Sequence, residues 1–294
     1  MKNLSKTMLA VLAVGLLSCG LLCQKAEAAP IPFFYNNDFP NNLIGTATRP
    51  ESAGKIEIES ADDFLPTPAL TQITSATFTG LIPTSATIGA VRVEIYRVFP
   101  NDSDTTRTPN VVTRQNSPSD VAFADRSSGD GNLSFTTTLL NPNFMASNSI
   151  LNGINPMPNQ FTGGEGPITG QEIRFNVNFT TPFLLPADHY FFVPQVELTG
   201  GTDNFFWLSA TRPLTPPSTV FAPDLQSWIR NANLDPDWSR IGTDIIDGNP
   251  APTFNASFSI TGTVVPDSGA TVALLVIALV GVEVLRRKLN AARA

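Results

Sequence analysis

The sequence predicts an all-β fold, an antiparallel β-sandwich of the jelly-roll kind, flanked by one helix at each end of the chain. Three observations lead to this prediction. Apolar and polar residues alternate in several short runs, as in strands that bury one face. No convincing amphipathic helix occurs between the two ends. The connections are rich in Pro, Asn, Asp, Gly and Thr, which favour turns.

Residues 1–28 have the composition of a secretory signal peptide. Its parts are a basic start, an apolar core and a small-x-small cleavage motif, formed by Lys2 and Lys6, residues 8–22, and Ala26-Glu27-Ala28. We expect the general secretion machinery to recognise this segment and cleavage to follow Ala28. The helix predicted at the N-terminus is therefore absent from the mature protein.

Both cysteines, Cys19 and Cys23, lie inside this segment. Residues 16–19 are similar to a bacterial lipobox, so a lipidated Cys19 is the alternative N-terminus. The apolar run continues past Cys19, which favours cleavage after Ala28. The mature chain then has no thiol, which excludes disulfides, thiolate metal sites and a cysteine nucleophile.

Residues 29–264 are expected to form one extracellular β domain. Alternation predicts three strands over 91–96, 171–180 and 254–260, with these side chains facing the core: Val91, Val93, Ile95, Ile173, Phe175, Val177, Phe179, Phe254, Ala256, Phe258 and Ile260. The unbroken apolar runs 190–193 and 205–208 predict strands that are buried on both faces. Residues 141–170 are expected to form a long loop.

A short segment of this domain resembles known extracellular modules. Glu59-Ser60-Ala61-Asp62-Asp63-Phe64 is similar to the first strand of jelly-roll domains that occur with varied surface anchors. The resemblance supports the predicted fold and implies no activity.

The charge of the domain is one-sided. Residues 29–269 contain 11 Arg and Lys and 23 Asp and Glu, which gives 11 − 23 = −12. Phosphate backbones and anionic membranes would repel this domain, so nucleic acid is excluded as a partner. Calcium is one alternative to plain solubility, with Asp102, Asp104, Asp125 and Asp130 as candidate loop ligands. Solvated turns explain these residues more simply.

The tail, residues 265–294, has three parts in a fixed order. They are the motif Val265-Pro266-Asp267-Ser268-Gly269, an apolar segment over 270–285, and a basic end over 286–294 that begins with Arg286, Arg287 and Lys288. The Pro and Gly of the motif interrupt any helix. The apolar segment predicts a short transmembrane helix, and the basic cluster is expected to stay in the cytoplasm.

This arrangement resembles the PEP-CTERM class of bacterial sorting signals, in the variant whose motif is VPDSG. The resemblance covers the tail and matches Val265 to Gly269 letter for letter. It implies an exosortase, a multi-spanning membrane transpeptidase, as the processing partner. It also implies an inner-membrane precursor and a mature form at the cell surface or in the extracellular matrix. The alternative is a passive anchor that follows an ordinary turn.

We find no set of residues typical of an enzyme. The chain has one histidine, His189, and its neighbour Asp188 would point to the opposite face of a regular strand. With so many acids, a pair such as Asp62 and Asp63 meets a glycosidase spacing by chance. We therefore expect no catalysis and no cofactor. A hydrolase with an unrecognised carboxylate site is an alternative.

Two tryptophans, Trp228 and Trp238, lie in polar stretches and are candidates for carbohydrate contact, although core packing is the simpler explanation for each. The sequence thus predicts an exported, exosortase-processed surface or matrix protein with a non-catalytic β-sandwich. A carbohydrate-binding module that attaches the cell to exopolysaccharide is the second hypothesis.

Overall fold

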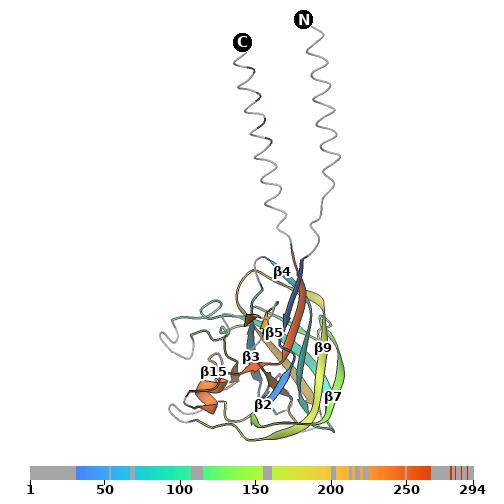
Figure 1. Ribbon diagram of the computed structural model, residues 1–294, viewed down its shortest axis with the longest axis vertical. Helices are drawn as coiled ribbons and strands as arrows, with labels where there is room; N and C mark the ends of the chain where they lie inside the picture. The colour runs from blue at the N-terminus through green and yellow to red at the C-terminus, as the bar shows by residue number, and fades with distance from the viewer. Residues whose placement is uncertain are drawn as a thin grey trace. The chain divides into compact units, whose positions relative to one another are not determined.

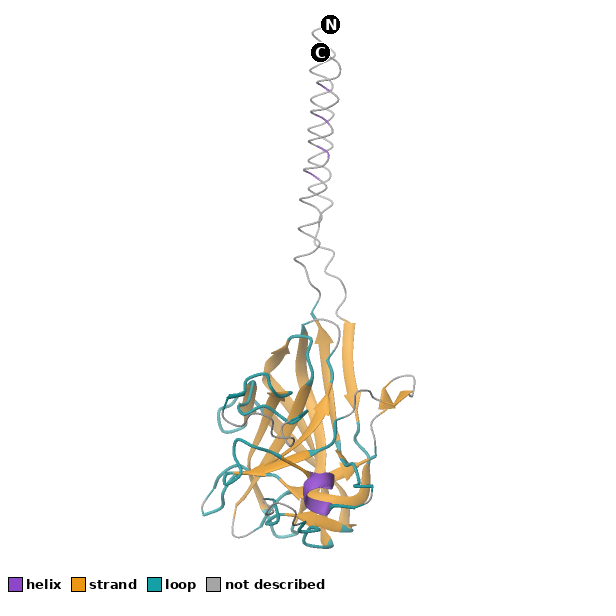
Figure 2. Cartoon of the chain, turned by 90° about the vertical axis from the view of Figure 1, so that its left-hand side faces the viewer, coloured by secondary structure: helices purple, strands orange, loops and turns teal. Residues whose placement is uncertain are grey.

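A computed structural model describes residues 31–52, 54–66, 70–106, 115–154, 161–199, 203–211, 214–215, 219–220, 225–248 and 250–265, together with Leu279, Val282, Arg286 and Asn290. Regular structure in this part of the chain is mostly β-strand (Figures 1 and 2), so the all-β prediction is confirmed. The exceptions are the four isolated tail residues, which are helical, and one short π-helix, η2 (Ile241–Ile246).

The strands follow one another from Ile31 to Val264. They are β1 (Ile31–Asn36), β2 (Pro40–Ala47), β3 (Ile58–Phe64), β4 (Thr71–Ile82), β5 (Thr87–Arg97), β6 (Ala124–Ser127), β7 (Ser134–Ala146), β8 (Asn148–Ile150), β9 (Ile168–Leu185), β10 (Tyr190–Thr199), β11 (Phe206–Ala210), β12 (Leu214–Thr215), β13 (Thr219–Val220), β14 (Trp228–Asn231), β15 (Ser239–Arg240), β16 (Asn255–Ala256) and β17 (Phe258–Val264).

Within the described residues, these strands form two main sheets. The larger sheet has nine strands: its path runs β1-β17-β4-β11-β2-β8, with β16 beside β11, β9 beside β4, and β7 beside β9. The smaller sheet has six strands in the order β15-β14-β3-β10-β5-β6. The ladders with a stated register are antiparallel, as predicted, except that β2 and β8 run parallel.

Aromatic side chains from both sheets meet in the core. Phe192 of β10 stacks on Phe258 of β17 with ring centroids 5.0 Å apart. Within the larger sheet, Phe78 stacks on Phe175 at 4.8 Å. Gly80 on β4 leaves room for the nearby aromatic ring of Phe205, because a Cβ at this position would lie 2.3 Å from that ring. The two sheets are therefore packed as the layers of a sandwich.

Most of the predicted core positions are confirmed. The alternating side chains of β9 are buried, and so are both continuous apolar runs, Tyr190–Val193 and Phe205–Leu208. Phe254 is a partial exception, since it is half-buried and precedes β16.

The predicted loop over 141–170 is wrong as a single loop. This stretch contains the end of β7, all of β8 and the start of β9. Its Asn and Pro residues suggested turns, but the β7–β9 register shifts on both sides of Asn141 and so accommodates Pro142 within an edge strand.

Several predictions fall on residues that the structure does not describe. They are the signal segment 1–28 with Ala26 and Ala28, the motif residues Pro266, Asp267, Ser268 and Gly269, the tail residues Arg287 and Lys288, and most of 270–285. Among the residues that are described, no helix has the length and apolar character needed to cross a membrane.

Candidate functional site

Strand β3 concentrates buried carboxylates in the smaller sheet. All of its residues are buried, including Glu59, Asp62 and Asp63. A buried carboxylate is costly unless it is hydrogen-bonded or paired with a cation. Because β3 lies between β14 and β10, its partners come from segments that are distant in the sequence.

Asp62 binds two segments that are distant in the sequence to β3. One oxygen accepts a hydrogen bond from the Ser227 hydroxyl at 2.8 Å, and the other accepts one from the backbone N–H of Ala256 at 2.8 Å. Both oxygens therefore bind parts of the fold. Asp63 follows Asp62 on the same strand and points to the opposite face, so the two carboxylates do not act as a pair.

Asp63 is instead the partner of the single histidine. Its Oδ2 lies 2.5 Å from His189 Nε2, and its Oδ1 accepts a hydrogen bond from the N–H of Leu225 at 3.1 Å. Asp188 contacts only the backbone N–H of His189 among the interactions described for this pair. The sequence could not indicate the Asp63 contact, because Asp63 lies on β3 and His189, 126 residues later, directly precedes β10.

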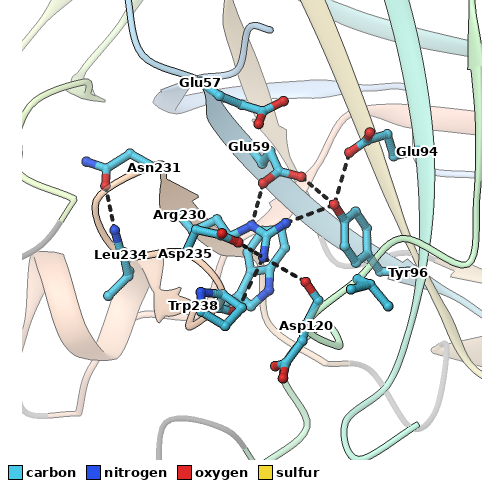
Figure 3. A network of polar contacts seen from close by, with 12 residues as sticks. Glu57, Glu59, Glu94, Tyr96, Asp120, Arg230, Asn231, Leu234, Asp235 and Trp238 are labelled. Atoms are coloured by element: carbon cyan, nitrogen blue, oxygen red, sulfur yellow. Dashed lines mark hydrogen bonds and ion pairs between the residues drawn. The ribbon is translucent and has the colours of Figure 1, made fainter. Parts of the chain in front are cut away.

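Arg230 is the centre of a second, larger group of polar residues (Figure 3). It lies opposite Glu59 in the β14–β3 ladder, and its Nε donates to Glu59 Oε2. Its Nη1 pairs with Asp235 Oδ1 at 2.7 Å and donates to the carbonyl oxygens of Asp120 and Pro236. We call Glu59, Glu94, Tyr96, Arg230, Asp235 and Trp238 the Arg230 network.

Two aromatic rings cover the guanidinium. Arg230 Cζ lies 4.4 Å from the centre of the Trp238 ring and 5.2 Å from that of Tyr96. These rings also meet each other edge to face at 5.4 Å. The cation is thus held between π faces as well as by carboxylates, and water is kept from it.

The Tyr96 hydroxyl joins both carboxylates of the network. Its oxygen lies 2.6 Å from Glu59 Oε1 and 3.0 Å from Glu94 Oε2, and it accepts a hydrogen bond from Arg230 Nη2 at 2.9 Å. A phenol has one proton, so it can donate to only one of the two carboxylates. The second contact needs a proton on one of the carboxyl groups. Glu94 is the candidate, because Glu59 is paired with the Arg230 cation.

The electrostatics agree with a protonated Glu94. Burial, followed by the charge of Glu59, raises the pKa of Glu94 to about 8, and this outweighs the partly exposed Arg92 at 2.8 Å. Burial also raises the pKa of the Tyr96 phenol. Burial alone would lower the pKa of Arg230, but Glu59 leads the charges that raise it above its usual range. Arg230 therefore stays charged, and the raised pKa of Glu94 favours its neutral form near pH 7.

The central residues of the Arg230 network are buried. Glu59, Glu94, Tyr96 and Arg230 are each 5% exposed or less. Asp235 is the exposed member of the network, with a side chain that is 54% exposed. The arrangement joins strands β3, β5 and β14 through contacts between their side chains.

Sequence reasoning missed this network. Alternation on β5 suggested that Arg92, Glu94 and Tyr96 face solvent, and this is wrong for Glu94 and Tyr96, which are buried. A small apolar cluster that includes Trp228 and Trp238 covers this second face of the sheet. A tyrosine on the polar side of a strand was the one local signal of such a cover.

The two tryptophans proposed for carbohydrate contact lie in that cover. Trp228 is 1% exposed and Trp238 is 2% exposed. Trp238 also donates through Nε1 to the carbonyl of Ser119 at 3.2 Å. Neither indole offers an open face on which a sugar ring could stack, so this hypothesis is corrected to core packing.

The calcium candidates are not gathered into one site. Asp102 lies 3.6 Å from Arg97 Nε, and Asp125 lies 3.6 Å from Arg92 Nη2. Asp104 accepts hydrogen bonds within its own turn, and Asp130 lies in a separate turn. In the described ranges, no group of three or more His, Cys, Asp or Glu side chains could hold a metal ion.

The sorting motif begins directly at the end of the β domain. β17 ends at Val264, and the next residue, Val265, donates its N–H to the carbonyl of Leu70 at 2.7 Å. The first motif residue is therefore held against the sheet.

Comparison with known proteins bears on the tail alone. Residues 264–289 match the model of the VPDSG-CTERM motif, which confirms the resemblance to PEP-CTERM-like sorting signals. No curated protein and no solved structure matches the chain. The motif supports export to the cell surface and implies processing by an exosortase-type enzyme.

Proposed function

We propose that this chain, which carries a VPDSG-CTERM motif, is the precursor of a cell-surface or matrix protein whose β domain is a non-catalytic structural module. The observation that carries the proposal is the motif match over 264–289, which begins where the last strand ends. A processing enzyme that recognises the motif would then work beside a folded domain, with no spacer between them.

The positions of the first and last strands support this proposal. β1 and β17 are neighbours, and Asn37, directly after β1, donates its N–H to the carbonyl of Phe258 at the start of β17 at 2.8 Å. The contact of Asn37 with the start of β17 places the first residues of β1 beside the last residues of β17, at one end of the larger sheet. Figure 1 shows these two strands, dark blue and orange-red, side by side. A signal peptide before Ile31 and a membrane helix after Val264 would both leave the domain on one side, as a membrane-held precursor requires.

We further propose the order of events. The signal peptide is removed after Ala28, the apolar segment 270–285 holds the precursor in the inner membrane, and the basic cluster from Arg286 keeps the end of the tail in the cytoplasm. The exosortase then cleaves at or near the motif and releases the β domain to the surface.

The closed state of the buried polar groups supports a non-catalytic domain. The carboxylates of β3 are each occupied by partners from the fold, and His189 is engaged by Asp63.

The experiment that tests the proposal replaces Pro266 and Gly269 by alanine in the native host. We expect the signal peptide to be removed as usual, because translocation depends on the N-terminal segment. We expect the uncleaved tail to remain, so the protein accumulates in the inner membrane. Fractionation followed by mass spectrometry of both ends measures the result.

A matched control changes one proline and one glycine in exposed turns, Pro250→Ala and Gly129→Ala. This variant should be processed like the wild type. If the Pro266→Ala/Gly269→Ala variant is also trimmed and delivered normally, the motif is only a linker and the tail is a passive anchor.

A further inference from the structure

The exposed edges of the two sheets differ in how they are protected. Unpaired strand edges invite pairing with another chain, and proteins block them with charges, prolines or short strands. Among the described edges, β15 has two residues and carries Arg240, and β6 has four residues that include Asp125 and Arg126. β8 has three residues, and β1 carries Pro32 in its second position.

Strand β7 lacks this protection along its first half. It has 13 residues, Ser134–Ala146, and no charged side chain. The absence of charge extends well beyond the strand, since residues 131–164 contain no Asp, Glu, Lys or Arg. Its single proline, Pro142, lies in the irregular second half, so Ser134–Leu139 is a regular uncharged strand. We call this segment the β7 border.

The β7 border is paired on one side only in the described structure. Its residues face β9 from Ser134↔Asn178 to Leu139↔Ile173 in an unbroken antiparallel register. No other described strand pairs with it (Figure 1, right-hand side). In an antiparallel ladder every second residue directs its N–H and C=O away from the partner. These groups form a ready template for a further strand.

The side chains of the β7 border are also exposed. Phe135 packs against the core, but Leu139 is 51% exposed although it has the same parity on the strand. The opposite sheet therefore covers only the start of this face. Leu140 is 43% exposed on the other face. A neighbouring strand would cover apolar surface on both faces.

We propose that the β7 border pairs antiparallel with the same segment of a second copy of this chain, so that the two larger sheets become continuous. A two-fold axis at Thr137 places Thr137 opposite itself and Phe135 opposite Leu139 of the second copy. On the other face, Thr136 lies opposite Thr138. Aromatic–aliphatic and Thr–Thr pairs are favourable cross-strand neighbours, and the same patch meets itself, as two-fold assembly requires.

The cross-strand pairs above and the absence of charge favour a second copy as the occupant. Two copies of a domain with a net charge of 11 − 23 = −12 over residues 29–269 repel each other over most of their surfaces. The β7 border and the uncharged residues that follow it in the sequence allow two such domains to meet without placing acidic residues of the two border strands opposite each other. This proposal goes beyond tail processing and is independent of it.

Cysteine cross-linking tests the register. The chain has two cysteines, both in the leader, and their replacement by serine gives the full chain a thiol-free background whether or not the leader is removed. Directly opposite Cβ atoms in an antiparallel pair lie about 4.5–5.5 Å apart, close enough for a disulfide after a small adjustment. Under mild oxidation, Thr137→Cys should give a disulfide-linked dimer.

A mixture of two variants sharpens the test. Thr136→Cys and Thr138→Cys should link to each other when mixed and link poorly when oxidised alone, since each faces the other position across the axis. Thr261→Cys on β17, which is also exposed, is the matched control and should stay monomeric.

The decisive comparison adds a charge at the axis. Thr137→Lys in the Thr136→Cys and Thr138→Cys chains should abolish their mixed dimer, because like charges directly opposite each other disfavour pairing. The proposal is overturned if Thr137→Cys links no more than Thr261→Cys, if the lysine leaves the mixed dimer unchanged, or if Thr137→Cys is recovered mainly on a different protein.

Discussion

The Arg230 network and the β7 border differ in where charged residues occur. In the smaller sheet, Glu59, Glu94 and Arg230 are buried, and each is engaged by hydrogen bonds or ion pairs. In the larger sheet, the β7 border is exposed and uncharged. Charged residues are usually found at the surface and rarely in the interior, so each region departs from that rule.

The contrast indicates what each region is for. A network of one buried cation with two buried carboxyl groups and the exposed Asp235 is tolerated only when its geometry is complete, so it fixes how β3, β5 and β14 align. An uncharged exposed edge has no such internal role and is a liability unless another strand covers it. We therefore assign the network to stability of the single chain and the border to assembly between chains.

The largest change in the free energy of unfolding is expected when the central cation is removed. Arg230→Met should lower the free energy of unfolding by about 3–5 kcal/mol, because Glu59 would remain buried without its partner. Arg174→Met is the matched control, since Arg174 is 38% exposed and lies 3.9 Å from Asp38. It should cost about 1 kcal/mol or less. Denaturant unfolding of both variants measures the difference. Equal losses of unfolding free energy would show that the buried network stabilises the fold no more than an exposed ion pair does.

The second prediction concerns pH. The unfolded chain releases the Glu94 proton near the ordinary pKa of 4.5, whereas the folded chain keeps it up to about pH 8. The folded state thus binds more protons in this window. Its stability should fall as pH rises from about 4.5 to about 8, by at most about 1.4 kcal/mol per pH unit from this group, and should level off above that.

The Glu94→Gln variant isolates this contribution. Glutamine cannot titrate, so the fall in unfolding free energy between pH 5 and pH 8 should be less steep than in the wild type. Unfolding curves at several pH values within this window measure the slope. An identical slope in both proteins would mean that Glu94 is already ionised in the folded state.

The third prediction separates the phenol from its ring. Tyr96→Phe keeps the contact with Trp238 but removes the hydroxyl shared by two carboxylates and Arg230. It should cost about 1–3 kcal/mol, because buried polar groups lose a partner. Tyr190→Phe removes a hydroxyl that donates to the carbonyl of Pro186 at 3.0 Å and also contacts Arg97 but joins no buried carboxylates, and it should cost about 0.5–1.5 kcal/mol. A larger loss of unfolding free energy in Tyr190→Phe than in Tyr96→Phe would contradict the stabilising role assigned to the Tyr96 hydroxyl.

The smallest change in the unfolding free energy of the monomer is expected for a substitution in the β7 border. Thr137→Lys should change the unfolding free energy of the monomer by about 0.5 kcal/mol or less, since Thr137 is exposed. The same variant should stop dimer formation, measured by light scattering. A large loss of monomer stability would place Thr137 in the core packing instead and remove the contrast between the two regions.

Local patterns predicted the strands but not their partners. The alternation of Ile173, Phe175, Val177 and Phe179 correctly identified the buried face of β9, because that face depends on the period of one strand. The same reasoning failed for Glu94 and Tyr96. Their burial depends on Arg230 and Trp238, which lie far along the chain and fold over the second face.

Predictions from the composition of a segment were wrong where contacts with distant parts of the chain determine its structure. Residues 141–170 are rich in turn-forming residues, yet part of this stretch extends β7 and starts β9. Trp228 and Trp238 lie among polar residues in the sequence, but the fold turns both rings inward. In contrast, the tail motif could be recognised directly, because its residues are contiguous and need no folded partner.

The most direct test of the central claim is mass spectrometry of the mature protein from its native host. We expect an N-terminus at Ala29 and a C-terminus at or near Val265–Gly269, so that residues 270–294 are missing. A mature protein that still ends at Ala294 would contradict exosortase sorting. A lipidated Cys19 at the N-terminus would contradict the assigned signal cleavage.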